Sequence, residues 1–441
     1  MKIDFLHLKA PGNWINDPNG FIYYKGKYHL FYQHFPYAPV WGTMHWGHAV
    51  SEDLIHWEHQ DIALFPTKYY DRNGIFSGSA LEKDGKLYLY YSAVRYLEEQ
   101  QENIHQANGK IETSQALIIS EDGFSFDNWG AKKQIIPVIR DPEIADSADA
   151  RDPKVWEENG RYYLIIGSTA QGKCGKVVLF SSEDGENWEY LSQCRNEHYG
   201  HTMECPDLFQ VNGMRVFIGS PMGIQNDGLE YANHSVCTLA EFDPESGILQ
   251  LPDQYERVDW GGDLYAPQTN LDREGRRVMI AWMRMPEAVD DADRPKWNGM
   301  MCLPRLVEVR NDRICFPVYP EVKKGFTQVE AVGTALASGA PFYIKTGIEE
   351  GEKINIGGFH LRMEDGCICA DRSEVFTDNK KFRTISKTPK IGEKASLEIF
   401  VEPNLIEVFI NDGEYVLSNV VYGLKDEADG NIHEVYLWKQ E

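Results

Sequence analysis

Hydrophobic residues in the first two thirds of the chain occur in short runs, and no stretch there has the 3.6-residue spacing of a helix. Five times, a turn ending in glycine leads into a run of aromatic and β-branched residues: KGKYHLFYQ, DGKLYLYYS, NGRYYLIIG, NGMRVFIGS and EGRRVMIAW. A short apolar run precedes each of these segments. The pattern predicts a strand, a tight turn and a second strand, repeated five times.

The turn glycines follow one another at similar distances. They are Gly26, Gly85, Gly160, Gly213 and Gly275, spaced 59, 75, 53 and 62 residues apart. A second motif, SED, begins at residues 51, 120 and 182, with spacings of 69 and 62. Five such units arranged radially form a five-bladed β-propeller, an all-β fold with short, protected strand edges. A string of β-sandwiches is the alternative, and the regular single-hairpin repeat favours the propeller.

The hairpin pattern stops after CFPVYPEV, which ends at Val322. The following residues alternate apolar and polar positions, as in ASLEIFVEPNLIEVFINDGEYVL, and turn signals separate the runs. This alternation is typical of an antiparallel β-sandwich. The sequence therefore predicts a propeller over residues 1–322 and a β-sandwich over residues 323–441, which meet in the charged stretch 321–325.

Composition narrows the range of partners. The chain has 441 residues, of which 42% are hydrophobic, and a net charge of −24. This charge is unfavourable for binding nucleic acid or an anionic membrane surface. No apolar run approaches the ~18 residues of a membrane span. A small neutral or polar molecule is the partner that fits best, and the oligomeric state stays open.

The eight cysteines are scattered along the chain. The closest pair, Cys367 and Cys369, has no second pair or histidine cluster beside it, so we expect reduced or buried thiols and neither a metal nor a cofactor. The segment MKIDFLHLKAPGNWIND has neither the apolar core nor the cleavage site of a signal peptide, which predicts a cytoplasmic protein.

Polar residues lie eight to ten positions before each turn glycine: Asp17, Ser77, Asp152, Glu204 and Tyr265. The first strand of every propeller blade lines the central channel, so we expect these residues to occupy one equivalent slot and their three carboxylates to converge. Crowding raises at least one carboxyl pKa, whereas Arg151 is expected to keep Asp152 ionised. Two carboxylates with separated pKa values are the basic apparatus of glycoside hydrolysis.

Large aromatic side chains accompany these positions: Trp14, Trp41, Trp46, Phe76, Tyr265 and Trp282. Aromatic faces interleaved with amides and carboxylates are typical of a sugar pocket, because a sugar offers apolar ring faces and hydroxyl groups. The pattern predicts a carbohydrate substrate.

Several motifs resemble those of glycoside hydrolase family 32, the β-fructofuranosidases. They are WINDPNG, HLFYQ, WGTMHWGHAVSEDLIHW, FSGSA, RDPKVW, ECPDLF, DLYAPQT and LPRLVEV, with IEVFINDGE in the C-terminal part. The resemblance implies a five-bladed propeller followed by a β-sandwich. It also implies Asp17 as nucleophile, Glu204 as general acid/base, and Asp152 as a transition-state stabiliser that holds fructose hydroxyls.

The same motifs imply a fructose subsite lined by Asn16, Gln33, Trp41, Phe76, Ser77 and Arg151. The aromatic pattern adds Trp14, Tyr265 and Trp282 as substrate-binding residues. One departure concerns the rim of the site. Family members often have Asn-Pro shortly after the glutamine of the first hairpin, where this chain has Gln33-His34-Phe35-Pro36. The group that leaves from fructose is therefore not fixed by the resemblance.

The resemblance implies a retaining hydrolase that releases terminal β-D-fructofuranosyl units from sucrose or fructo-oligosaccharides, with sucrose 6-phosphate and fructans as further candidates. A fructosyltransferase would share the covalent intermediate. An arabinan- or xylan-cleaving enzyme with the same propeller is a second alternative, and a non-catalytic sugar-binding propeller is a third.

Overall fold

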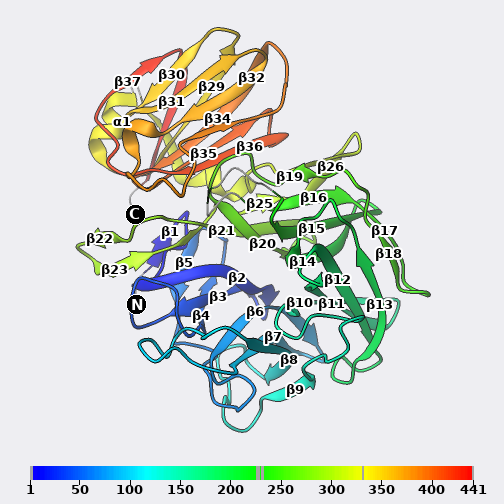
Figure 1. Cartoon of the computed structure of the whole chain (residues 1–441). Coiled ribbons are helices and arrows are strands. Elements are labelled where there is room, and N and C mark those ends of the chain that lie inside the picture. Colours follow the sequence, from blue (N-terminus) through cyan, green and yellow to red (C-terminus); the bar gives the residue numbers. More distant parts are fainter. Residues whose placement is uncertain (1–2, 225–228, 230–232, 330–331, 440–441) are drawn as a thin grey trace.

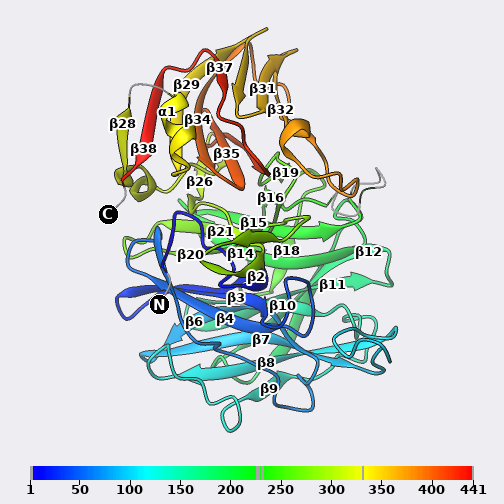
Figure 2. The same ribbon diagram turned by 90° about the vertical axis from the view of Figure 1, so that its left-hand side faces the viewer.

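A computed structural model of the protein describes residues 3–224, 229, 233–329 and 332–439 (Figure 1). It contains a ring of β-sheets, coloured blue to green, and a layered β-unit, coloured yellow to red. Both views place the layered unit on one side of the ring (Figure 2). The all-β propeller and β-sandwich that the sequence predicts are confirmed.

Each blade is an antiparallel sheet built mainly from consecutive strands. Blade 1 has β2 (Asn13–Tyr24), β3 (Lys27–Phe35), β4 (His45–Ser51) and β5 (His56–His59), with β1 (Ile3–Phe5), β22 (Val289–Asp291) and β23 (Arg294–Asn298) added at its edges. Blade 2 has β6 (Gly74–Lys83), β7 (Lys86–Tyr96), β8 (Ile111–Ser120) and β9 (Lys133–Ile136). Blade 3 has β10 (Arg151–Glu158), β11 (Arg161–Ala170), β12 (Cys174–Ser182) and β13 (Glu189–Arg195).

The last two blades have shorter outer strands. Blade 4 has β14 (Thr202–Val211), β15 (Met214–Met222), β16 (Val236–Leu239) and β19 (Glu256–Arg257), with a hairpin of β17 (Glu241–Asp243) and β18 (Ile248–Gln250). Blade 5 has β20 (Leu264–Leu271), β21 (Arg277–Met283), β24 (Met300–Met301) and β25 (Arg305–Leu306), followed by a hairpin of β26 (Glu308–Arg310) and β27 (Arg313–Cys315).

The first strands of the blades contact one another around the ring: β2 with β6, β6 with β10, β10 with β14, β14 with β20, and β20 with β2. They therefore line the central channel. The ring closes through β23, which pairs in parallel with β2, so a strand from the end of the propeller sequence is joined to the first blade.

The two repeated sequence signals are both turn signals. All five turn glycines have positive φ, between 74° and 87°, a conformation that glycine adopts without steric cost. In each SED motif the serine hydroxyl accepts a hydrogen bond from the backbone N–H three residues later, and the aspartate caps the next two N–H groups. These Asx-type turns connect the third and fourth strands of blades 1 to 3.

The C-terminal unit packs two antiparallel sheets face to face. One sheet has β28 (Phe326–Val329), β38 (Glu434–Trp438), β29 (Phe342–Glu349), β34 (Lys394–Glu402), β35 (Leu405–Ile410) and β36 (Tyr415–Val420). The other has β33 (Ile385–Lys387), β32 (Cys367–Asp371), β31 (Phe359–Glu364), β30 (Lys353–Ile356) and β37 (Ala428–Gly430). The helical segments are η1 (Pro320–Gly325), α1 (Val332–Ser338) and η2 (Ser373–Val375). Within the described residues, no helix has the length and apolar character needed to cross a membrane.

Charged side chains are buried where the propeller meets the sandwich. Arg305 of blade 5 donates to Asp259 at 2.8 Å and to Glu407 of the sandwich at 2.6 Å. His7, near the start of the chain, bonds Glu402 at 2.6 Å and Glu407 at 2.8 Å. Burial opposes protonation of His7, but the two glutamates outweigh it and raise its pKa to about 9. A buried network with alternating charges holds the two units in one orientation.

Candidate active site

A pocket of about 550 Å³ lies where the first strands of the five blades meet. Pairs of consecutive residues from four blades line it: Asn16 and Asp17, Phe76 and Ser77, Arg151 and Asp152, and Glu204 and Cys205. Blade 5 contributes Tyr265 and Trp282. In a regular strand, neighbouring side chains point to opposite faces, so such pairs require a departure from regular geometry.

β-Bulges supply this departure. Every first strand shifts its register against its partner at the pocket: between Ile15 and Pro18, Phe76 and Gly78, Arg151 and Lys154, Glu204 and Asp207, and Tyr265 and Gln268. A bulge places an extra residue on one strand and re-aims the side chains beside it. Three bulge residues, Asp152, Cys205 and Ala266, have positive φ of 65°, 47° and 52°, a strained conformation for a residue other than glycine.

The bulges correct one prediction. Asp152 lies inside the bulge of its strand. Glu204 and Tyr265 instead lie just before the bulges of their strands, where Glu204 pairs with Ser220 and Tyr265 pairs with Trp282. Arg151 holds the corresponding position in blade 3. The three acids therefore do not occupy one equivalent slot. Positions at a similar distance from the turn glycines are not equivalent, because the hairpins differ in length by one residue. The carboxylates converge nonetheless, because a bulge turns two adjacent positions toward the channel.

Asp17, the predicted nucleophile, is held by hydrogen bonds on both carboxylate oxygens. Ser77 donates to Oδ2 at 2.5 Å, and the amide of Asn16 donates to Oδ1 at 3.2 Å. The amide of Gln33 donates to the Ser77 hydroxyl at 2.7 Å, which leaves that hydroxyl free to donate to Asp17. Burial raises the pKa of Asp17 and the charge of Glu204 adds to the rise, while the Ser77 and Asn16 hydrogen bonds oppose it.

Asp152 is 7% exposed and accepts a hydrogen bond from the backbone N–H of Cys205 at 2.8 Å. Burial raises its pKa to about 7, and the carboxylates of Glu204 and Asp17 reinforce the rise against the opposing charge of Arg151. Arg151 therefore does not hold the pKa of Asp152 low, contrary to what the sequence led us to expect. The Arg151 guanidinium is hydrogen-bonded to Glu204 and Asp149 instead, and burial outweighs its attraction. The predicted rise of a carboxyl pKa through crowding is confirmed.

Glu204, the predicted general acid/base, has a donor on each oxygen. Arg151 donates to Oε1 from Nη2 at 3.0 Å and from Nε at 3.3 Å. The Tyr265 hydroxyl lies 2.8 Å from Oε2. Because both oxygens are engaged, the carboxyl group is fixed in one orientation toward the pocket.

Most predicted site residues line this pocket. They are Asn16, Asp17, Gln33, Trp41, Phe76, Ser77, Arg151, Asp152, Glu204, Tyr265 and Trp282. Trp14 is outside the lining: its indole N–H donates to Asn16 Oδ1 at 2.8 Å, and its ring packs on Trp282. Trp46 is fully buried and donates to the backbone of Phe76. Both tryptophans therefore support residues of the lining and do not face the cavity.

Further residues complete the lining: Tyr96, Gln100, Gln106, Ala107, Ile111, Asp149 and Cys205. Cys205 belongs to the ECPDLF motif and Asp149 lies two residues before the RDPKVW motif, so the motifs were the available signal. The Cys205 thiol lies 3.7 Å from Asp17 and 3.6 Å from Asp152. The remaining five lie in or beside a polar stretch between two strands of blade 2, which has little β signal and no motif. Its place at the pocket follows only from the fold.

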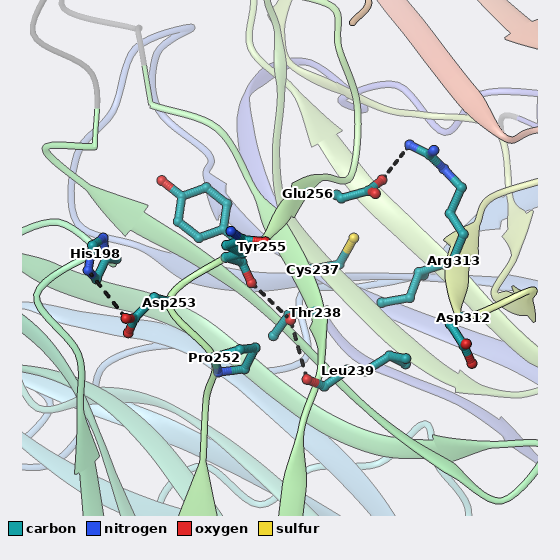
Figure 3. A pocket seen from close by; sticks show the side chains of 12 residues that line it. His198, Cys237, Thr238, Leu239, Pro252, Asp253, Tyr255, Glu256, Asp312 and Arg313 are labelled. Atoms are coloured by element: carbon teal, nitrogen blue, oxygen red, sulfur yellow. Dashed lines mark hydrogen bonds and ion pairs between the residues drawn. The ribbon is translucent and has the colours of Figure 1, made fainter. Parts of the chain in front are cut away.

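A second hollow, of about 670 Å³, lies at the outer edge of blade 4 (Figure 3). Several of its polar side chains pair with one another: Glu256 with Arg313 at 2.6 Å, and His198 with Asp253 at 3.7 Å. The Thr238 hydroxyl is directed to backbone carbonyls. None of the convergent carboxylates of the central pocket lies here, so the chemistry belongs to the central pocket.

The central pocket defines a class of enzyme. Carboxylates that converge in one pocket, with amides and aromatic rings around them, are the equipment of a glycoside hydrolase.

Comparison with known proteins identifies the family. A model described as the glycosyl hydrolases family 32 N-terminal domain matches residues 7–317, and one described as the family 32 C terminal matches residues 337–440. The sucrose-6-phosphate hydrolase of Bacillus subtilis (strain 168) is 34% identical over 440 residues, covering 94% of this chain and 87% of that protein. The raffinose invertase of Escherichia coli is 31% identical over 457 residues, covering 98% and 92%.

Solved structures agree with these matches. The family 32 β-fructofuranosidase of Bombyx mori superposes with a TM-score of 0.81 at 27% identity, covering 100% of this chain and 94% of that one. A mutant of the same enzyme in complex with sucrose gives 0.77 at 28% identity, covering 99% and 91%. The chain belongs to glycoside hydrolase family 32 and is a β-fructofuranosidase-type glycoside hydrolase.

Proposed function

We propose that the enzyme releases terminal β-D-fructofuranosyl units from sucrose-type saccharides by double displacement. The observation that carries this proposal is the convergence of Asp17, Asp152 and Glu204 in one buried pocket, where the pKa values of Asp17 and Asp152 are raised. Carboxyl groups that lie this close interact, so one member of such a cluster can hold a proton while another acts as an anion.

In the first step, a carboxylate oxygen of Asp17 forms a bond to C2 of the fructosyl group while the bond from C2 to the glycosidic oxygen breaks. Glu204 gives its proton to the departing oxygen, so the leaving sugar is released as an alcohol. The hydrogen bonds from Ser77 and Asn16 hold the Asp17 carboxylate in place for the attack.

In the second step, Glu204, now a carboxylate, takes a proton from water as that water attacks C2 and displaces Asp17. Asp152 binds fructose hydroxyls and stabilises the positive charge that develops on the sugar ring in both transition states. Arg151 and Tyr265 keep Glu204 oriented through the exchange of its proton.

The shape of the site supports attack at the end of a saccharide. The pocket has a floor of carboxylates and a rim that bears Trp41, whose ring packs edge-on against Phe76. We propose that a single fructosyl unit occupies the part of the pocket beside these carboxylates. The Bombyx mori enzyme binds sucrose in one of its structures, and a small carbohydrate is the partner that we propose for this chain as well.

We also propose that the catalytic propeller covers residues 1–322 and the sandwich residues 323–441. All eight cysteines lie in the described part of the chain and none of them forms a disulfide. Such thiol usage supports a reducing compartment, and we propose the cytoplasm as the site of action.

The decisive experiment follows the first product by NMR before it mutarotates. Two inversions at C2 give net retention, so β-fructofuranose is expected first from sucrose. If α-fructofuranose appears first, Asp17 acts as a base and the proposed mechanism is wrong. Fructose release from sucrose, kestose, inulin and levan, measured beside arabinan and xylan, defines the substrate. Kestose formation at high sucrose concentration would indicate a transferase.

A further inference from the structure

A loop of blade 2 forms one wall of the catalytic pocket. This rim loop, residues 97–110, connects β7 to β8. From it, Gln100, Gln106 and Ala107 line the pocket, together with Tyr96 and Ile111 at the ends of the two strands. The three carboxylates come from the first strands of blades 1, 3 and 4, so the rim loop adds a wall of the pocket that bears none of them.

The rim loop has a defined shape. An isolated β-bridge joins Glu99 to Ala107, and the backbone N–H of Gln100 donates to Gln106 at 3.0 Å. Glu99 is held to the body of blade 2 because its carboxylate accepts hydrogen bonds from Arg72 at 2.7 Å and Asn73 at 2.9 Å. The anchored segments 99–100 and 106–107 therefore present both glutamines, while residues 101–104 between them are exposed.

The rim loop offers uncharged hydrogen-bonding groups to the pocket. The Gln100 amide N–H donates to the Ala107 carbonyl at 3.1 Å, which leaves its side-chain oxygen as an acceptor. Gln106 is exposed at the mouth of the pocket and brings both a donor and an acceptor. Carboxamides of this kind match the hydroxyl groups of a neutral sugar.

The charge of the pocket opposes an anionic substrate. Its lining has four carboxylates, those of Asp17, Asp149, Asp152 and Glu204. Among the described lining residues, Arg151 is the only cation, and it is already bound to Glu204 and Asp149. A phosphate group, with ~1.5 to 2 negative charges at neutral pH, would meet no available cation in this lining.

Cations near the rim loop do not change this balance. Arg95 and Arg140 both pair with Glu112, which follows the rim loop in β8. Lys110, the last residue of the rim loop, is exposed and outside the pocket lining.

We propose that the rim loop forms the leaving-group subsite and that this subsite selects an uncharged sugar over a phosphorylated one. The proposal rests on the proposed function, which it refines. The proposed substrate preference differs from the activity for which the Bacillus subtilis relative, a sucrose-6-phosphate hydrolase, is named.

The test compares kcat/KM for sucrose with kcat/KM for sucrose phosphorylated at O6 of glucose, at constant ionic strength. We expect sucrose to be preferred by at least ~10-fold, largely through KM. Equal values or a preference for the phosphorylated sugar would overturn the proposal. If neither compound releases fructose, the proposed function itself fails, which is a distinguishable result.

Lysine substitutions locate the subsite. Gln100→Lys and Gln106→Lys each supply a cation for the phosphate. We expect each to lower the ratio of kcat/KM for sucrose to kcat/KM for the phosphorylated sugar by at least ~5-fold. Gln101→Lys is the matched control, because Gln101 is exposed in the same loop but outside the lining. A similar narrowing in the control would mean that general charge, and not the subsite, sets the preference, and the assignment of the rim loop would be wrong.

Discussion

Replacing Asp152 with asparagine tests whether the active site is built at a cost to stability. Asparagine has nearly the same shape, and its side-chain oxygen retains an acceptor for the Cys205 N–H. The substitution removes only the buried charge. We therefore expect Asp152→Asn to be more stable than the wild type at neutral pH, although its kcat falls at least ~10²-fold because a transition-state contact is lost.

The magnitude follows from the pKa of Asp152. Its rise from 3.8 to about 7 means that the folded protein binds this proton more tightly than the unfolded chain does. Below pH 3.8 the carboxyl is protonated in both states and contributes nothing. As the pH rises to 7, the unfolded chain gains the freedom to ionise and the folded state loses relative stability, reaching a cost of about 4 kcal/mol above pH 7. The advantage of the variant should grow over the same interval.

The assay is urea unfolding of both proteins between pH 4 and 8.5, with initial rates on sucrose measured in parallel. Asp122→Asn is the matched control. Hydrogen bonds from the backbone N–H groups of Ser125 and Phe124 lower the pKa of Asp122, so this variant should lose stability above pH 4. An Asp152→Asn protein that is less stable than the wild type at pH 8, or whose advantage does not change with pH, would refute the reasoning.

Two further predictions concern the acids and the chain connection. Asp17→Asn and Glu204→Gln should both fold and should both lower kcat by at least ~10³-fold, and near-normal turnover in either would remove its assigned role. Limited proteolysis should cut first in the exposed stretch 101–104, and not in 321–325, where Val322 is buried in a core shared by the propeller and the sandwich. Early cleavage at 321–325, detected by mass spectrometry, would show that the two units do not share that core.

The fold could be predicted because its signals are local. A glycine such as Gly160 must adopt positive φ in the hairpin turn, and the residues beside it must suit a strand. About ten residues are therefore enough to recognise the hairpin of each blade. The alternation of apolar and polar positions marks the sandwich in the same local way. The convergence of Asp17, Asp152 and Glu204 then follows from placing the repeats around a common axis.

Features that depend on contacts between distant segments could not be predicted. The bulges displace Glu204 by one position relative to Asp152, and the distance to the turn glycine does not reveal that displacement. The charge balance around Asp152 depends on where the Arg151 guanidinium points, and it points to Glu204. Gln100 lines the pocket only because of the path that the rim loop takes between β7 and β8.

The sandwich is connected to this chemistry through the strand that carries Tyr265. Asp263, two residues before Tyr265, is fully buried. Its carboxylate accepts hydrogen bonds from two groups of the sandwich, Arg372 Nη2 at 3.0 Å and the backbone N–H of Val420 at 2.7 Å. A forked, fully desolvated arginine–carboxylate pair tolerates little movement. The backbone of β20 is thereby fixed just where it presents the Tyr265 hydroxyl to Glu204. None of the described lining residues comes from the sandwich, yet its docking holds the strand that presents the Tyr265 hydroxyl to Glu204, the proposed general acid/base.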